Sequence, residues 1–236
     1  MSTYASGNRI IQIHPSRRCN LQCLHCYSSS SPTVDESLSV ELLSSAIADA
    51  AFEGFEVVSF SGGEPLLFPA LEHLMDQAHL HQMTNSMVTN GMLLTPRRLQ
   101  SLIGKIDILA ISLDGRPETH NLMRNQKNAF ETMQKNLPAL RESGIPFGFV
   151  FTLSQKSIKD FDWILEFAME QGASLLQVHA LEESGRAKST LLGVSPNQEL
   201  AAYTYLQVMR ARKRVGDRIQ IQLDLTHQSA IKAYPE

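Results

Sequence analysis

The stretch Cys19-Asn20-Leu21-Gln22-Cys23-Leu24-His25-Cys26-Tyr27 contains all three cysteines of this 236-residue chain, in the spacing Cys-x3-Cys-x2-Cys. It lies in a polar loop that begins after Pro15-Ser16-Arg17-Arg18 and ends in a run of four serines. A fold that used cysteine only for packing would scatter it along the chain. Three thiolates within eight residues can instead close around a soft metal centre.

Three kinds of site fit this cysteine spacing. In a cubane iron-sulfur cluster, three cysteines leave one of the four irons open to a substrate or cofactor. A structural zinc ion needs a fourth ligand, which would be His14 or His25, and the second adjoins Cys26 so closely that joint ligation is awkward. Unrelated free thiols are the third possibility, because a disulfide framework favours an even count in a secreted protein.

The composition is that of an ordinary globular protein, with 43% hydrophobic and 19% charged residues. A formal charge of -3 argues against a broad basic face for nucleic acid. No apolar run approaches the ~18 residues of a membrane span, and the N-terminus lacks the pattern of a secretion signal. We therefore expect a cytoplasmic protein without a nucleic-acid or membrane partner.

Short apolar segments alternate with helical patterns along most of the chain. Such alternation predicts parallel strands joined by crossover helices. Six units are too few for a closed eight-fold barrel, so we expect an α/β fold with a partial (β/α)6 TIM-like barrel, and a flat doubly wound sheet is the alternative. The expected strands are 10–13, 57–60, 86–89, 106–112, 146–153 and 174–179, and the expected helices are 40–52, 69–81, 96–103, 128–142 and 158–170.

A helix over 196–214 and a last strand over 219–223 follow these six units. We therefore expect a core domain of residues 1–194. Residues 195–236 would either complete the barrel or begin an extension that is truncated at its C-terminus. The segment 226–236 shows no obvious helical finish.

Polar, glycine-containing loops follow the first four predicted strands. They are the cysteine loop, Ser61-Gly62-Gly63-Glu64-Pro65, Asn90-Gly91 and Asp114-Gly115. The carboxyl ends of parallel strands lie on one rim of a barrel or sheet, where ligands bind. These four loops therefore predict one site.

With this order of motifs, the sequence resembles the radical S-adenosylmethionine superfamily over residues 10–187. The resemblance implies that Cys19, Cys23 and Cys26 bind a [4Fe-4S] cluster. It also implies that S-adenosylmethionine chelates the open iron through its amine and carboxylate.

The resemblance also suggests which residues contact S-adenosylmethionine. Tyr27 resembles the aromatic residue that lies against the adenine, although a tyrosine that anchors the loop is an alternative. Gly62, Gly63 and Glu64, with Ser61 before them, resemble the segment that meets the methionine amine. Glycines allow close backbone approach and a carboxylate bonds an ammonium group, whereas a plain turn with a solvated glutamate is the alternative.

Ser112-Leu113-Asp114-Gly115 followed by Arg124 is similar to the peptide-modifying, SPASM-associated branch of this superfamily. There the serine and aspartate lie near the ribose, and the arginine pairs with the methionine carboxylate. A turn aspartate and a surface arginine are the alternatives. Asn90 and Thr152 are further candidates for the site, equally consistent with strand-end caps. Gly185-Arg186-Ala187 resembles a Gly-Arg-Ala motif of the same branch.

The resemblance implies a reaction that begins with one electron from an external donor of the flavodoxin or ferredoxin type. Cleavage of S-adenosylmethionine then gives a 5'-deoxyadenosyl radical, which abstracts hydrogen from a peptide or small-molecule substrate. Tailoring of a porphyrin or other small cofactor precursor is an alternative, and a non-catalytic iron-sulfur or zinc module is another. No cysteine follows Cys26, so the chain lacks the C-terminal cysteines of the peptide-modifying branch. No catalytic acid or base is predicted.

Overall fold

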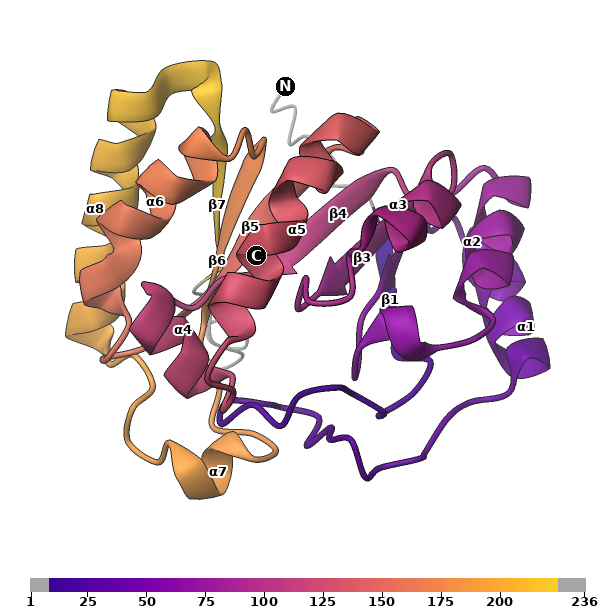
Figure 1. Cartoon of the computed structure of the whole chain (residues 1–236), viewed down its shortest axis with the longest axis horizontal. Helices are drawn as coiled ribbons and strands as arrows, with labels where there is room; N and C mark the ends of the chain where they lie inside the picture. The colour runs from indigo at the N-terminus through magenta and orange to yellow at the C-terminus, as the bar shows by residue number, and fades with distance from the viewer. Residues whose placement is uncertain (1–8, 225–236) are drawn as a thin grey trace.

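A computed structural model describes residues 9–224 of the chain. Its seven strands form one sheet in which every pair of neighbours is parallel and the spatial order follows the chain order (Figure 1). The strands are β1 (Ile10–Ile13), β2 (Val57–Phe60), β3 (Thr84–Thr89), β4 (Ile108–Ser112), β5 (Phe147–Leu153), β6 (Leu175–Ala180) and β7 (Gln220–Asp224).

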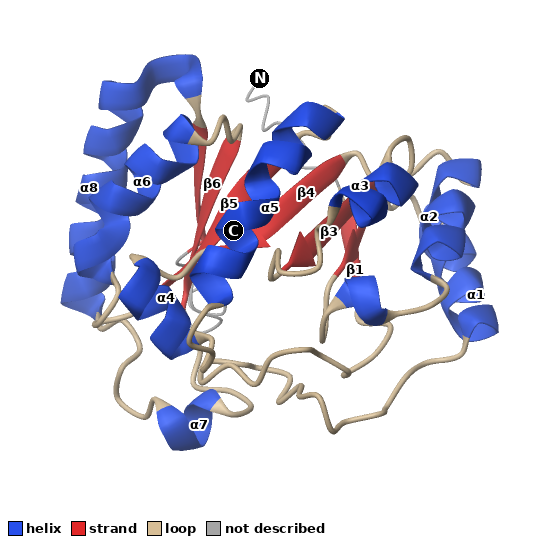
Figure 2. Cartoon of the chain, in the orientation of Figure 1, coloured by secondary structure: helices blue, strands red, loops and turns tan. Residues whose placement is uncertain are grey.

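Helices connect these strands and flank the curved sheet (Figure 2). The α-helices are α1 (Val40–Phe52), α2 (Leu71–Leu80), α3 (Pro96–Leu102), α4 (Pro117–Met123), α5 (Ala129–Ser143), α6 (Phe161–Glu170), α7 (Ala187–Thr190) and α8 (Gln198–Val215). Three short 3-10 helices complete the described part, η1 (Pro65–Leu67), η2 (Ile158–Asp160) and η3 (Gly216–Arg218).

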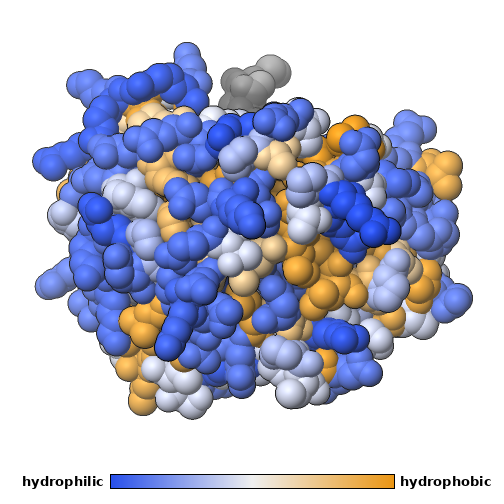
Figure 3. Space-filling view, viewed as in Figure 1, coloured by the Kyte–Doolittle hydropathy of each residue, from blue (hydrophilic) through white to orange (hydrophobic). Residues whose placement is uncertain are grey.

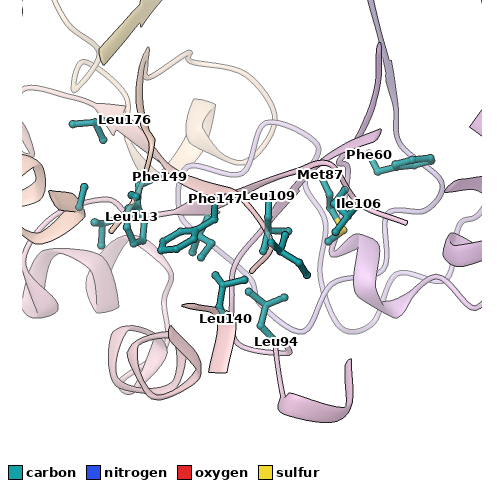
Figure 4. Packing of buried hydrophobic residues seen from close by; sticks show 14 of the residues in the cluster. Phe60, Met87, Leu94, Ile106, Leu109, Leu113, Leu140, Phe147, Phe149 and Leu176 are labelled. Carbon is teal, nitrogen blue, oxygen red and sulfur yellow. The ribbon is translucent and has the colours of Figure 1, made fainter. Parts of the chain in front are cut away.

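The two faces of the sheet have different neighbours because side chains alternate along a strand. In β5, Phe147, Phe149 and Phe151 are buried in the main hydrophobic core. Figure 4 shows Phe147 and Phe149 in this core together with Leu109 of β4 and Leu140 of α5. Val150 and Thr152, which alternate with these phenylalanines, line a cavity on the other face. The sheet is therefore a half-barrel with helices outside and a site inside.

Strand register brings the first two loops together at the carboxyl rim. Ile13, the last residue of β1, is paired with Phe60, the last residue of β2. Both strands therefore end at the same level, and the cysteine loop leaves the sheet beside the Ser61–Glu64 segment. The backbone N–H of Ser61 donates to the carbonyl of Ile13 at 2.9 Å and begins this contact.

The predicted open barrel is confirmed, and the structure extends it by β7, which pairs in parallel with β6. The doubly wound alternative is wrong because the strand order runs from β1 to β7 without the reversal that such a sheet requires. The boundary between residues 194 and 195 stays a prediction, and the predicted segment 226–236 lies outside the described residues.

Two short helices, α4 and α7, were not predicted from the sequence. The predicted helix 40–52 has the same bounds as α1, and the other predicted helices are present with shifted ends, for example Leu71–Leu80 in place of 69–81. Hydrophilic side chains cover most of the face seen in Figure 3, with hydrophobic patches between them. None of the helices in the described part of the chain is long and apolar enough to cross a bilayer.

Candidate functional site

A cavity of about 450 Å³ opens at the carboxyl rim of the half-barrel. Twelve of the thirteen residues predicted for the site line it, and only Asp114 does not. These twelve are Cys19, Cys23, Cys26, Tyr27, Ser61, Gly62, Gly63, Glu64, Asn90, Ser112, Arg124 and Thr152. The fold thus brings residues from four loops and two strand ends to one place.

In the structure, the cysteine loop comprises residues 14–39, between β1 and α1, and its first residues are hydrogen-bonded to the loop after β2. The Gly63 N–H donates to the carbonyl of Ser16 at 3.0 Å, and the Glu64 N–H donates to the carbonyl of Arg18 at 2.9 Å. A Cβ on Gly62, where φ is +108°, would lie 2.9 Å from the Cβ of His14, and one on Gly63 would overlap the Arg18 carbonyl.

These contacts correct the expected reason for the two glycines. The sequence argument assigned them to close approach of the backbone to a ligand. In the structure, the space that a side chain would need is occupied by the protein's own cysteine loop. The glycines therefore bring the sulfur-bearing loop against Glu64, and they also line the cavity.

The three cysteines form no disulfide bond, and they differ in burial. Cys19 and Cys23 are buried and Cys26 is half-buried. Burial raises the pKa of Cys19 to about 12, and burial likewise raises the pKa of Cys23. Metal binding must therefore displace thiol protons in this pocket.

The histidines that could complete a zinc site are engaged elsewhere. The Nε2 atom of His14 lies 3.1 Å from the Tyr27 hydroxyl. His25 has Nδ1 at 3.3 Å from the carbonyl of Met123 and Nε2 at 3.6 Å from Asp114. Within residues 9–224, no three His, Cys, Asp or Glu side chains converge on a point that suits a single ion. Three cysteines that line one cavity, with both histidines engaged elsewhere, fit a three-cysteine iron-sulfur cluster better than a four-ligand zinc site.

Glu64 is buried and its carboxylate accepts three hydrogen bonds. The donors are the Thr89 hydroxyl at 2.7 Å, the Asn90 N–H at 3.0 Å and the Leu66 N–H at 3.3 Å. Burial raises the pKa of Glu64, and these hydrogen bonds oppose the rise. The alternative of a solvated glutamate in a plain turn is therefore wrong, because Glu64 is 1% exposed.

Arg124 and Asp114 form a buried ion pair behind the cysteines. Arg124 Nε donates to Asp114 Oδ2 at 2.6 Å and Nη2 donates to Oδ1 at 3.2 Å. The remaining nitrogen, Nη1, lies 3.9 Å from the sulfur of Cys23. The alternatives of a surface arginine and a simple turn aspartate are both wrong.

Asp114 and Arg124 each stabilise the charged form of the other against the effect of burial. Burial alone would raise the pKa of Asp114, but Arg124, with His25 and His120, lowers it to about 2. Burial alone would lower the pKa of Arg124, but the Asp114 carboxylate raises it. Asp114 is fully buried and holds Arg124 in place, whereas contact with a ribose stays a prediction.

The remaining predicted residues form the cavity wall. The Tyr27 hydroxyl lies 3.4 Å from Ser61 Oγ, and the Asn90 amide donates to Asn20 Oδ1 at 2.8 Å. Ser112 ends β4 and Thr152 lies in β5. Asn90 therefore connects the loop after β3 to the cysteine loop, which is more than a strand-end cap.

The sequence argument missed the far wall of the cavity. His179 of β6, Glu182 after β6 and Asp224 of β7 line it, whereas Gln12 lines the cavity from β1, at the opposite edge of the sheet. The Nδ1 atom of His179 lies 3.2 Å from Asp224 Oδ2. The rule that functional side chains gather at the carboxyl ends of strands would have found His179 and Asp224 if applied to the last two strands.

Comparison with protein-family models matches residues 13–168 to the Radical SAM superfamily. Fe-coproporphyrin III synthase of Methanosarcina barkeri is 33% identical over 173 residues, which are 72% of this chain and 43% of that protein. PqqA peptide cyclase of Ruegeria pomeroyi is 28% identical over 188 residues, 77% of this chain and 49% of that protein. The chain spans about half the length of these curated relatives.

Among solved structures, Streptococcus suis SuiB bound to precursor peptide SuiA aligns with a TM-score of 0.76 over 98% of this chain and 51% of that chain. The sequence identity is 17%, so this similarity shows the fold alone.

Proposed function

Because the chain belongs to the radical SAM superfamily, we propose that it cleaves S-adenosylmethionine reductively at a [4Fe-4S] cluster and abstracts hydrogen from a peptide substrate. Members of this superfamily are enzymes that use this cluster and S-adenosylmethionine, and they require a reductant. The observation that carries the proposal is the meeting of Cys19, Cys23 and Cys26 with Glu64 and Arg124 in one cavity.

Each group in the cavity has a proposed role. The three thiolates would hold the cluster, which when bound supplies the electron that breaks the sulfonium carbon-sulfur bond. Glu64 would bind the methionine amine, since a buried carboxylate favours an ammonium partner. Arg124, held by Asp114, would bind the methionine carboxylate. Tyr27, Ser61, Asn90, Ser112 and Thr152 would contact the remainder of S-adenosylmethionine.

The half-barrel would protect the reactive intermediate from water. Leu21, Val88 and Val150 give the cavity apolar wall between its polar groups. Such a wall offers few exchangeable hydrogens near the reacting carbon and excludes solvent during the reaction. The electron would come from a flavodoxin- or ferredoxin-type donor.

The peptide substrate is favoured by the far wall of the cavity. His179, Glu182 and Asp224, together with Gln12 at the opposite edge of the sheet, offer hydrogen-bond donors and acceptors that suit backbone amides. PqqA peptide cyclase, a relative at 28% identity, has a peptide as its named substrate. Glu182 and Asp224 also bring negative charge to the side where substrate would enter.

A porphyrin precursor is the second candidate. It is favoured by the 33% identity to Fe-coproporphyrin III synthase, which exceeds the 28% identity to the peptide cyclase. The two carboxylates of the far wall oppose it, since a coproporphyrin carries carboxylates of its own and like charges repel.

Anaerobic reconstitution with iron and sulfide tests the central proposal. Reconstituted protein should absorb broadly near ~400 nm and should release 5'-deoxyadenosine from S-adenosylmethionine after dithionite reduction. Cys23→Ala should lose both properties. The proposal fails if wild-type protein binds the cluster and never cleaves S-adenosylmethionine.

Deuterium transfer separates the two substrate classes. Reconstituted protein would be given either a candidate precursor peptide or coproporphyrin, each deuterated at carbon, and the 5'-deoxyadenosine would be analysed by mass spectrometry. Deuterium from the peptide supports the first candidate, and deuterium from coproporphyrin alone replaces it by the second.

A further inference from the structure

The segment that follows β6, residues 181–194, lies against the cysteine loop. It contains α7, which lies at the bottom of Figure 1 near the indigo loop that follows β1. Leu181 and Glu182 at its start line the cavity. We call residues 181–194 the β6 segment.

One residue of the β6 segment, Arg186, binds three carbonyl groups around the cysteines. Its N–H donates to the carbonyl of Cys26 at 2.9 Å. Its guanidinium donates from Nη1 to the carbonyl of Cys23 at 2.7 Å and from Nη2 to the carbonyl of Ser30 at 2.7 Å. Two of the three acceptors belong to cysteines, and the third follows the last cysteine by four residues.

Gly185 permits this close approach. Its φ of +53° lies in the left-handed region, and a Cβ there would overlap the carbonyl of Tyr27. The Thr190 hydroxyl adds a bond to the carbonyl of Leu24 at 2.6 Å. The β6 segment thus satisfies carbonyls at residues 23, 24, 26 and 30.

The cysteine loop depends on such contacts because it has no regular secondary structure between residues 19 and 30. Without a ladder of its own, its backbone groups need partners from elsewhere in the chain. A guanidinium suits this task, since its planar fork can bind two acceptors at once.

We propose that Arg186 is a positioning residue for the cluster, which fixes the backbone of Cys23 and Cys26 so that both sulfurs face the cavity before metal binds. This inference rests on the proposed cluster site. The positive charge of the Arg186 guanidinium would also stabilise the added electron of a reduced cluster, because the reduction potential of such a cluster responds to local charge and hydrogen bonding.

The test compares reconstituted Arg186→Ala, Arg186→Gln and Arg186→Lys with the wild type. Arg212→Ala is the matched control, because Arg212 also makes two hydrogen bonds to a main-chain carbonyl, that of Ile221, and does not line the cavity. We would measure iron and sulfide per chain, the rate at which a chelator removes iron, the reduction midpoint, and the thermal unfolding of the metal-free proteins.

Arg186→Ala should lose iron to the chelator about 10- to 100-fold faster than the wild type, the usual effect of removing a group that supports a metal ligand. Arg186→Lys should recover part of this loss and keep the wild-type midpoint, whereas Arg186→Gln should lower the midpoint. Arg212→Ala should match the wild type in iron loss.

Equal rates of iron loss in wild type, Arg186→Ala and Arg186→Lys would overturn the inference and leave the proposed function intact. A wild type that binds no cluster would overturn both. If Arg186→Ala does not fold, the rate of iron loss from Arg186→Lys is compared with that from Arg212→Ala. Faster loss from Arg186→Lys supports the inference, and equal rates overturn it.

Discussion

At Gly63 a single hydrogen in place of a side chain brings two loops into contact. The Arg18 carbonyl occupies the place of a Cβ, and the neighbouring Glu64 N–H donates to that same carbonyl. The cysteine loop can therefore keep its position only because residue 63, in the loop after β2, has no Cβ.

Gly63→Ala should displace the cysteine loop and weaken cluster retention about tenfold, because overlap with backbone cannot be relieved by a rotamer change. Iron release to a chelator measures this. Gly104→Ala is the control: it has φ of +77° and open space around its Cβ position, so it should cost about 1–2 kcal/mol in stability without changing iron release. Equal iron release by both variants would contradict the prediction.

Because Asp114 and Arg124 form a buried ion pair, removing only one of them should greatly lower the free energy of unfolding. Asp114→Ala leaves a buried cation without its carboxylate, which should lower the free energy of unfolding of metal-free protein by about 3–5 kcal/mol. The double variant Asp114→Ala with Arg124→Met should lose less than the two single changes together. Additive losses in urea unfolding would show that the pair is not coupled.

The same pair predicts how stability changes in acid. The pKa of Asp114 is lowered from 3.8 to about 2, so its contribution is present above about pH 4 and is lost as the pH falls toward 2. The stability difference between wild type and Asp114→Asn should therefore shrink over this interval. A difference that stays constant from pH 5 to about pH 2 would contradict the assignment.

At the scale of helices, two asparagines that each precede a helix differ in whether their side chain caps it. Asn197 Oδ1 accepts from the Leu200 N–H at 2.8 Å at the start of α8, whereas Asn128 precedes α5 without a side-chain cap. Asn197→Ala should lower the free energy of unfolding by about 1 kcal/mol, and Asn128→Ala should change it by less than half of that. Urea unfolding measures both, and equal losses would be the contrary result.

Elements with strong periodic patterns were predictable from the sequence, and short ones were not. The strand around Phe149 carries an apolar run that predicts its place in the sheet. By contrast, α7 has four residues and no capping hydrogen bond from a side chain, so nothing local distinguishes it from a loop.

For the site, the cysteine spacing, the loop order and the resemblance to the radical S-adenosylmethionine superfamily together predicted 12 of the 24 residues that line the cavity. The roles of two residues could not be predicted from the sequence, because each depends on contacts with residues far away in the chain. One is the role of Gly63, which is decided by the Arg18 carbonyl, and the other is that of Arg186, whose acceptors lie about 160 positions earlier.

At the scale of the whole molecule, the cysteine loop follows β1 and contacts segments that follow the second and the sixth strands. It is bonded to the loop after β2 through Gly63 and Glu64 and to the β6 segment through Arg186. A ligand that binds only the folded form stabilises it by mass action, so cluster loading should stabilise the entire half-barrel.

Reconstituted protein should therefore unfold at a higher temperature than the metal-free protein, and S-adenosylmethionine should raise it further only when the cluster is present. Anaerobic differential scanning calorimetry measures these temperatures. Cys23→Ala is the control and should show neither increase. Identical unfolding temperatures for loaded and metal-free wild type would contradict this coupling.

Strands β1 and β7 each pair with a single neighbour among the described residues, so the sheet ends in two edges and does not close on itself. A tunnel would admit a long polymer only by threading from one terminus. For the proposed peptide substrate, an opening between the two edges would allow entry from the side, with both ends of the peptide outside the cavity. We therefore expect residues deep inside a chain, or within a cyclic one, to be as accessible to this enzyme as those near a free end.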